Sequence, residues 1–211
     1  MAQVADVALK NCGAFLYDCE IFKLVPSEDV ANDPQFQYCK GWNDFSGMGI
    51  SVAVGYDFLV GEYKIFMADN FHELRQVIES RDVVISFNGH HFDDELILAN
   101  GIDLPKRKSY DLWKEIVNTQ PPGNRFGFAL DEMLKGNGIP LKTSSGAEAP
   151  KMAQRGEWAR LINYCLGDVA KTVMILRLAC NGMMKNPKTG GYLNIRKPWE
   201  VIQVEPGGAL F

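Results

Sequence analysis

The stretch "AFLYDCEIF", residues 14–22, combines a run of apolar side chains with two acids, Asp18 and Glu20. A short apolar run of this kind is typical of a strand buried in a sheet. Side chains two residues apart in a strand point to the same face, so both carboxylates would project from one side. Neighbouring carboxylates repel each other and lose solvation on burial, a cost that a bound divalent cation removes. The alternative is that the strand ends at Asp18 and Glu20 already lies in solvent.

Further strands and helices predict an α/β domain with a mixed sheet. The clearest signal is "GISVAVGYDFLVGEYKIFMA", residues 49–68, in which two β-rich runs flank a Val-Gly-Glu turn, as in an antiparallel hairpin. Another buried strand is expected at 82–88, and a short strand leading into a helix at 108–117. Helices are predicted at 70–80, 93–101, 128–138 and from about Glu157 to Asn181. Three strands followed by alternating helix and strand favour one domain over residues 1–211.

The remaining segments are expected to be irregular or extended. Residues 26–48 and 141–156 are predicted as loops, and residues 192–204 as a short strand-like tail. Asp69 or Asn70 is expected to cap the helix that follows it.

The composition is that of an ordinary globular protein. The chain has 211 residues, of which 46% are hydrophobic and 23% charged, with a net charge of −4, which argues against disorder. This charge gives no general attraction to a polyanion, so a nucleic-acid site would need local cations or bound metal. The five cysteines form no CxxC pair and no zinc-ligand spacing. Because no signal peptide and no apolar run of ~18 residues is visible, we expect a reduced cytoplasmic location and no membrane contact.

A second group of polar side chains lies in "LINYCLGDVAKTVMIL", residues 161–176. The apolar residues of this segment recur at helical spacing. Tyr164 and Asp168 are four residues apart, so they are neighbours on the helix surface, at the border between its apolar stripe and its solvent side. Such a pair can form the wall of a cleft, or it can be the solvated flank of an amphipathic helix.

A third group lies in "FNGHHFDDEL", residues 87–96, after another expected strand. Asn88 ends that strand, a glycine turn follows, and Asp93 comes directly after Phe92, an aromatic side chain that can anchor it. We therefore expect Asp93 to face the strand ends. An acid at the start of a helix is often only a cap or a charge favourable to the helix dipole, and Asp94 fits that role.

In chain order the three groups are Asp18-x-Glu20, Asn88-x-x-x-Phe92-Asp93 and Tyr164-x-x-x-Asp168. Their order and separation resemble the three exonuclease motifs of the DnaQ-like 3'→5' exonucleases, the DEDD superfamily. Tyr164 is similar to the tyrosine that defines the tyrosine branch of this superfamily. The resemblance spans residues 14–176, and the loop before the third motif is similar to phage and bacterial members. It implies an α/β, RNase H-like fold with a mixed five-stranded sheet flanked by helices. It also implies two Mg²⁺ or Mn²⁺ ions and hydrolysis of nucleotides from a 3' end.

The same resemblance implies a role for each motif residue. The metal ligands would be Asp18, Glu20, Asp93 and Asp168. Their carboxylate oxygens are the ligands that such hard cations prefer. Asp18 would bridge both ions, and Tyr164 would orient the attacking water, because a phenol with a pKa near 10 is a poor base at neutral pH. The residues expected to bind substrate are Asn88, Phe92 and Lys142.

One position departs from the family pattern. Ile21 follows the second acid where family members often have Thr, which affects a contact to the terminal nucleotide rather than metal binding. His90 and His91 lie within the second motif and are interpreted as loop residues. Further side chains that can hold a nucleic-acid strand by stacking or charge are Phe22, Trp42, Lys151 and Arg155.

These residues favour metal-dependent removal of nucleotides from the 3' end of single-stranded or frayed DNA. An exoribonuclease is an open alternative, because no residue visibly recognises a 2'-hydroxyl. A relative that binds nucleic acid without cutting is another, although loss of one of the four acids would be expected there. The expected partner is nucleic acid with a free 3' end, and whether a replication or repair partner delivers it stays open.

Overall fold

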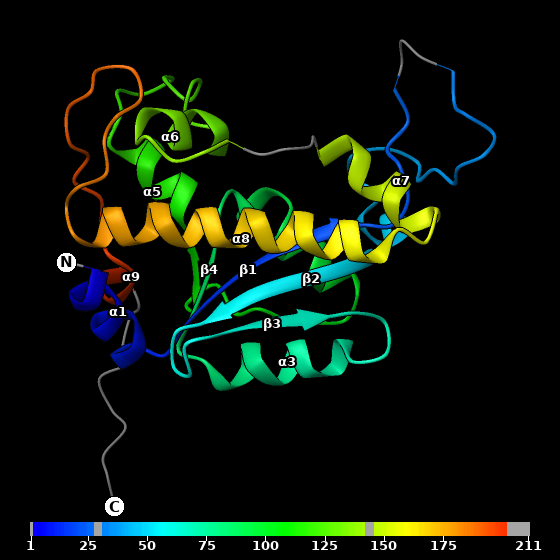
Figure 1. Cartoon of the computed structure of the whole chain (residues 1–211), viewed down its shortest axis with the longest axis horizontal. Coiled ribbons are helices and arrows are strands. Elements are labelled where there is room, and N and C mark those ends of the chain that lie inside the picture. Colours follow the sequence, from blue (N-terminus) through cyan, green and yellow to red (C-terminus); the bar gives the residue numbers. More distant parts are fainter. Residues whose placement is uncertain (1, 28–30, 142–145, 202–211) are drawn as a thin grey trace, which may run out of the picture.

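The computed structural model describes residues 2–27, 31–141 and 146–201, and a five-stranded mixed sheet forms its centre (Figure 1). The strands are β1 (Ala14–Ile21), β2 (Ile50–Asp57), β3 (Glu62–Phe66), β4 (Val83–Ser86) and β5 (Ser109–Asp111). They lie in the order β3-β2-β1-β4-β5, antiparallel from β3 to β1 and parallel from β1 to β5. The predicted α/β class with a mixed five-stranded sheet is thereby confirmed, and it is consistent with the RNase H-like fold.

Helices flank both faces of this sheet. α8 (Trp158–Cys180) crosses one face over β1 and β2, and α3 (Phe71–Ser80) and α4 (Asp93–Ala99) pack against the other face (Figure 1). The other helices are α1 (Ala2–Asn11), α2 (Phe45–Met48), α5 (Leu112–Asn118), α6 (Leu130–Gly136), α7 (Ala149–Gln154) and α9 (Pro198–Val201), with short 3-10 turns η1 (Gly89–His91) and η2 (Gly146–Glu148). No helix in the described ranges is both long and apolar enough to cross a bilayer.

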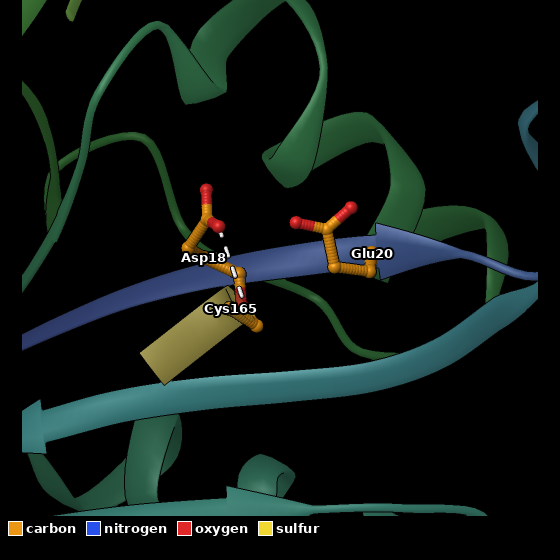
Figure 2. A group of neighbouring side chains, drawn as sticks. All are labelled: Asp18, Glu20 and Cys165. Carbon is orange, nitrogen blue, oxygen red and sulfur yellow. Dashed lines mark hydrogen bonds between the residues drawn. The ribbon is translucent and has the colours of Figure 1, made fainter. Parts of the chain in front are cut away.

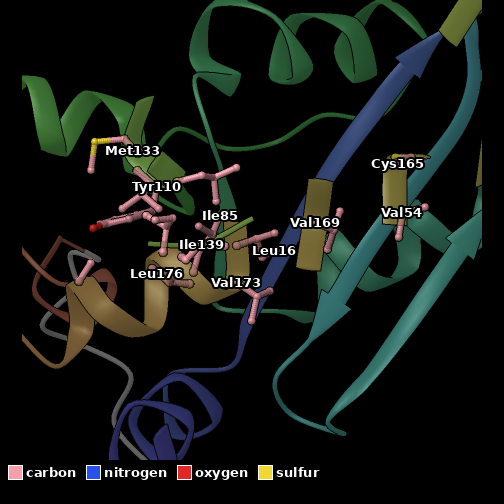
Figure 3. Packing of buried hydrophobic residues seen from close by; sticks show 14 of the residues in the cluster. Leu16, Val54, Ile85, Tyr110, Met133, Ile139, Cys165, Val169, Val173 and Leu176 are labelled. Atoms are coloured by element: carbon pink, nitrogen blue, oxygen red, sulfur yellow. The ribbon is translucent and has the colours of Figure 1, made fainter. Parts of the chain in front are cut away.

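Alternation of side chains along β1 divides its residues between two cores. Leu16 packs with Val169 of α8 in the larger core (Figure 3). Tyr17, the next residue, points to the opposite face and packs in the core formed with α3 and α4. Because Asp18 and Glu20 follow Leu16 in the alternation, they lie on the face that α8 covers.

Most elements expected from the sequence are confirmed. The hairpin over residues 49–68 is formed by β2 and β3, and the long helix expected from about Glu157 is α8. The other expected segments correspond in chain order to α3, β4, α4, β5 with α5, and α6.

Some local predictions are wrong. The predicted loop at 141–156 contains α7, whose first turn includes Pro150, a residue favoured there because the first helical N–H needs no partner. The tail expected to be strand-like forms an isolated bridge between Lys185 and Tyr192 and then α9, while residues 202–204 lie outside the described ranges. Two helices, α1 and α2, were not foreseen.

The predicted cap of α3 is confirmed in position but not in its side-chain bond. Asn70 is the N-cap residue, yet its side chain makes no cap hydrogen bond. Its carboxamide instead accepts the Met67 N–H at 2.7 Å and donates to the Ile65 carbonyl at 3.0 Å. The side chain therefore closes the turn at the end of β3 rather than the start of α3.

Candidate active site

The two acids of the first motif lie side by side on β1. The strand continues to Ile21, so the alternative in which it ends at Asp18 is wrong. Glu20 is buried and Asp18 half-buried. Figure 2 shows both carboxyl groups on the same side of β1, and one oxygen of each lies within 4.8 Å of the other and of the Cys165 sulfur. The arrangement is that of a potential cation site.

Cys165 of α8 packs directly against this pair. Its Sγ lies 3.6 Å from the Asp18 carbonyl oxygen and 3.8 Å from Asp18 Oδ2 (Figure 2). Burial, followed by the charges of Asp18 and Glu20, raises the pKa of this thiol well above its ordinary value. A thiol that stays protonated is a weak donor and not a thiolate ligand. Cys165 therefore packs beside the two acids, whose carboxylate oxygens are the ligands that hard cations such as Mg²⁺ and Mn²⁺ prefer to sulfur.

Asp93 reaches the same place from the start of α4. β1 pairs with β4 only from Ala14 to Leu16, so the backbone of β1 beyond that point is open on its β4 side. The Cys19 N–H in this open stretch donates to Asp93 Oδ1 at 3.1 Å. Burial and the charge of Asp18 raise the pKa of Asp93 well above its ordinary value. Asp93 is thus a buried neighbour of Asp18.

Tyr164 and Asp168 complete the group from α8. Asp168 is 4% exposed, so the solvated-flank alternative is wrong for it, while Tyr164 is half-buried. Burial, the charges of Asp168, Glu20 and Asp18, and a hydrogen bond with Asp168 raise the pKa of the Tyr164 phenol. The phenol consequently lies among three carboxylates that are distant in the sequence.

The structure therefore brings five predicted residues together from three segments. β1 supplies Asp18 and Glu20, α4 supplies Asp93, and α8 supplies Tyr164 and Asp168. Carboxylate oxygens suit Mg²⁺ or Mn²⁺. The raised pKa of Asp93 shows that desolvation and repulsion by Asp18 disfavour its charge, and a divalent cation would relieve that cost. On donor chemistry and electrostatics, the site fits the expected ions.

The predicted substrate-binding residues have different surroundings. Asn88 adopts the left-handed backbone conformation with φ 66°, and its N–H donates to Asp111 Oδ1 at 2.9 Å. Phe92 is half-buried, with its ring centroid 6.0 Å from that of Phe45 and 6.4 Å from that of Trp42. This packing fits the expected anchoring of Asp93. Lys142 lies outside the described residues.

The additional residues predicted to hold a nucleic-acid strand differ in their exposure and contacts. Trp42 is 68% exposed and packs edge-on against Phe92, which precedes Asp93. Phe22 is partly buried against the larger core. Lys151 pairs with Glu148, and the Arg155 guanidinium lies over the Phe36 ring at 5.0 Å. Trp42 is the candidate that is both exposed and next to the second motif.

Some residues around the site were not recognised in the sequence. Asp111 caps α5 and also accepts the N–H groups of Asn88 and His90, so it holds the turn that follows β4. A cavity of about 590 Å³ lies beside this turn and is lined by His90, Asp94, Ser109, Lys114, Arg196 and others. None of the four predicted metal ligands lines it. In the sequence, Asp111 is an acid between a short strand and a helix. Any helix N-cap has the same pattern, so the sequence did not reveal its bonds to the turn after β4.

Comparison with known proteins supports the fold. No protein-family profile and no curated protein matches the chain. Solved structures do match, among them the family B DNA polymerase from the hyperthermophilic archaeon Pyrobaculum calidifontis, with a TM-score of 0.51 and 16% sequence identity. The match covers 78% of this chain but only 24% of the polymerase chain. At this identity the similarity shows a shared fold.

We expect Asp93→Asn to stabilise the metal-free protein at pH 8. Because the folded pKa of Asp93 is raised, its ionisation costs folding free energy above the unfolded pKa near 3.9, and the cost grows until the pH passes the folded value. Asparagine can keep the bond from Cys19 without the charge. Thermal unfolding in EDTA should show a Tm higher by about 2–5 °C at pH 8, with a smaller gain at pH 5.

Asp57→Asn is the matched control. Asp57 is fully buried and accepts two bonds from Arg81, at 3.0 and 2.8 Å. Removing one partner of a buried ion pair leaves the other uncompensated, so this variant should have a lower Tm at both pH values. If Asp93→Asn is destabilised at pH 8 to the same degree, repulsion at Asp93 is refuted.

Proposed function

We propose that this chain is a metal-dependent 3'→5' exonuclease that acts on single-stranded or frayed DNA. The observation that carries the proposal is the meeting of Asp18, Glu20, Asp93, Tyr164 and Asp168 in one partly buried group. These residues also match the three motifs of the DnaQ-like exonucleases. A solved structure with a similar fold is named as a DNA polymerase, and on that likeness we propose DNA rather than RNA as the substrate class.

In this proposal the four carboxylates hold two Mg²⁺ or Mn²⁺ ions. Asp18, which neighbours both Asp93 and Tyr164, would serve both ions, while Glu20 and Asp168 would help to hold one of them and Asp93 the other. Bound ions of this kind lower the pKa of a water molecule and stabilise the attacking and leaving oxygens of a phosphodiester. The protein contributes a fixed, partly dry arrangement of acids.

Tyr164 acts as a hydrogen-bond donor rather than a base. Its raised pKa keeps the phenol protonated at neutral pH, so it cannot remove a proton from water there. Its hydroxyl can instead orient the attacking water next to Asp168. Its contribution is therefore to positioning, which affects the rate of the chemical step more than metal affinity.

The substrate end is held next to the acids by aromatic side chains. Trp42 offers an exposed ring beside Phe92, and nucleic-acid bases stack on such rings without strong sequence preference. Lys142 stays a predicted phosphate contact. A single-stranded or frayed end fits because the terminal phosphodiester has to reach the carboxylates.

The first test uses 5'-labelled DNA and RNA oligonucleotides with Mg²⁺ or Mn²⁺. The wild type should produce a ladder that shortens from the 3' end of DNA. Asp18→Ala should reduce the rate more than about 100-fold, because even residues that only support a metal ligand typically contribute 10–100-fold. Faster degradation of RNA would make the chain an exoribonuclease. Internal fragments, or an unchanged ladder with Asp18→Ala, would refute the assignment.

The second test is Tyr164→Phe, which removes the hydroxyl and keeps the ring. We expect kcat to fall about 10- to 100-fold, since misplacement of a reactant by about 1 Å can cost this much. The Mn²⁺ dissociation constant, measured by calorimetry, should change little. A large loss of metal affinity at unchanged kcat would contradict the positioning role.

The third test is Trp42→Ala. Loss of one stacked base corresponds to about 1–3 kcal/mol, so KM for single-stranded DNA should rise about 5- to 150-fold while kcat changes little. Phe126→Ala is the matched control, because Phe126 is 85% exposed and lies in the segment between α5 and α6. Equal effects of the two substitutions would mean that Trp42 is not a stacking site.

A further inference from the structure

Two hydrogen bonds connect β1 to the start of α4 on either side of Asp18. The Tyr17 hydroxyl donates to Asp94 Oδ1 at 2.7 Å, and the Cys19 N–H donates to Asp93 Oδ1 at 3.1 Å. Tyr17 and Cys19 are the immediate neighbours of Asp18, and Asp93 and Asp94 are the first two residues of α4. The bonds therefore join the two segments at the point where their acids meet.

The second oxygen of Asp94 is also occupied. Asp94 Oδ2 accepts the Ser109 hydroxyl at 2.6 Å, and Ser109 Oγ lies 2.8 Å from His90 Nε2. The backbone of Gly89 packs closely against the Asp94 carboxylate, because a Cβ there would lie 3.0 Å from Asp94 Oδ1. β1, β5 and the turn after β4 thus all fix one carboxylate. Asp94 is more than the helix cap that the sequence suggested.

The Tyr17 side of this connection is enclosed in the core. Tyr17 is 1% exposed and its hydroxyl lies 2.7 Å from Asp94 Oδ1, so bulk water does not compete for the bond. Across the same junction the charges of Asp18 and Asp93 repel each other, and the two hydrogen bonds act against that repulsion.

We propose that Tyr17 and Asp94 are positioning residues, whose hydrogen bond holds Asp93 beside Asp18 before any cation binds. Neither side chain belongs to the predicted motifs or to the predicted metal ligands. Their action is through Asp93, whose bond to the Cys19 N–H they keep in register. The consequence for metal affinity rests on the proposed function, whereas the consequence for the Cys19 bond does not.

Tyr110 provides a matched comparison within the same sheet. It lies on β5, is 2% exposed, and donates its hydroxyl to the Arg196 carbonyl at 2.8 Å. Tyr17→Phe and Tyr110→Phe each remove one buried hydroxyl and one hydrogen bond, with a somewhat larger loss of stability expected at Tyr17, whose acceptor is a carboxylate. The difference in global stability is measured by thermal unfolding and subtracted when the two variants are compared. A purely structural role for Tyr17 predicts that the two variants behave alike in every other respect.

The experiment compares these variants with the wild type by two measurements. The first is hydrogen exchange of the Cys19 amide in EDTA, followed by NMR. In Tyr17→Phe we expect it to be roughly 5- to 10-fold faster than in Tyr110→Phe. The second is Mn²⁺ affinity by calorimetry. We expect it to be weaker by about 10- to 100-fold in Tyr17→Phe and unchanged in Tyr110→Phe, as for other residues that orient a metal ligand.

The two measurements separate this proposal from the proposed function. Equal exchange of the Cys19 amide in the two variants overturns the positioning role, whatever the metal result. Faster exchange in Tyr17→Phe together with no Mn²⁺ binding by the wild type keeps the positioning role and refutes the metal site. Normal Mn²⁺ affinity in Tyr17→Phe with a binding wild type shows that the bond has no consequence for metal binding and also overturns the proposal.

Discussion

β1 continues past its last pairing with β4, that of Leu16 with Ile85, and the backbone left open there determines what can approach it. A buried N–H needs an acceptor, and at Cys19 the acceptor is the carboxylate of Asp93. The same stretch of β1 presents Asp18 and Glu20 to the α8 face. Because β4 stops pairing with β1 at Leu16, the open backbone of β1 lies in the same stretch as its two acids.

α8 adds the side chains that lie against the acids of β1. Its apolar residues pack on β1 and β2 in the larger core, so its position along the sheet is determined by burial over much of its length. That position places Cys165 against Asp18 and brings Asp168 and Tyr164 to Glu20. Hydrophobic packing therefore supplies the stability that holds mutually repelling carboxylates together.

The similarity to a DNA polymerase concerns the fold and covers about a quarter of that protein. A fold of this kind can host different activities, so the functional argument has to come from the site. Here the site argument is specific, because Asp18 and Glu20 of β1 lie beside Asp93 of α4 and beside Tyr164 and Asp168 of α8 in a partly buried place. The surrounding hydrogen bonds of Asp94 and Asp111 add a rigid frame.

The sequence by itself determined the strands, the hairpin and the long helix, because these depend on local periodicity, and it predicted from motif order which acids would lie together. It could not show that Asp94 is fixed by Tyr17 and Ser109, or that Cys165 underlies Asp18. α7 was missed as well, since a short helix depends on packing more than on propensity. Only the tertiary structure decided these points, because side chains far apart in the chain become neighbours through strand register and helix packing, which no single segment encodes.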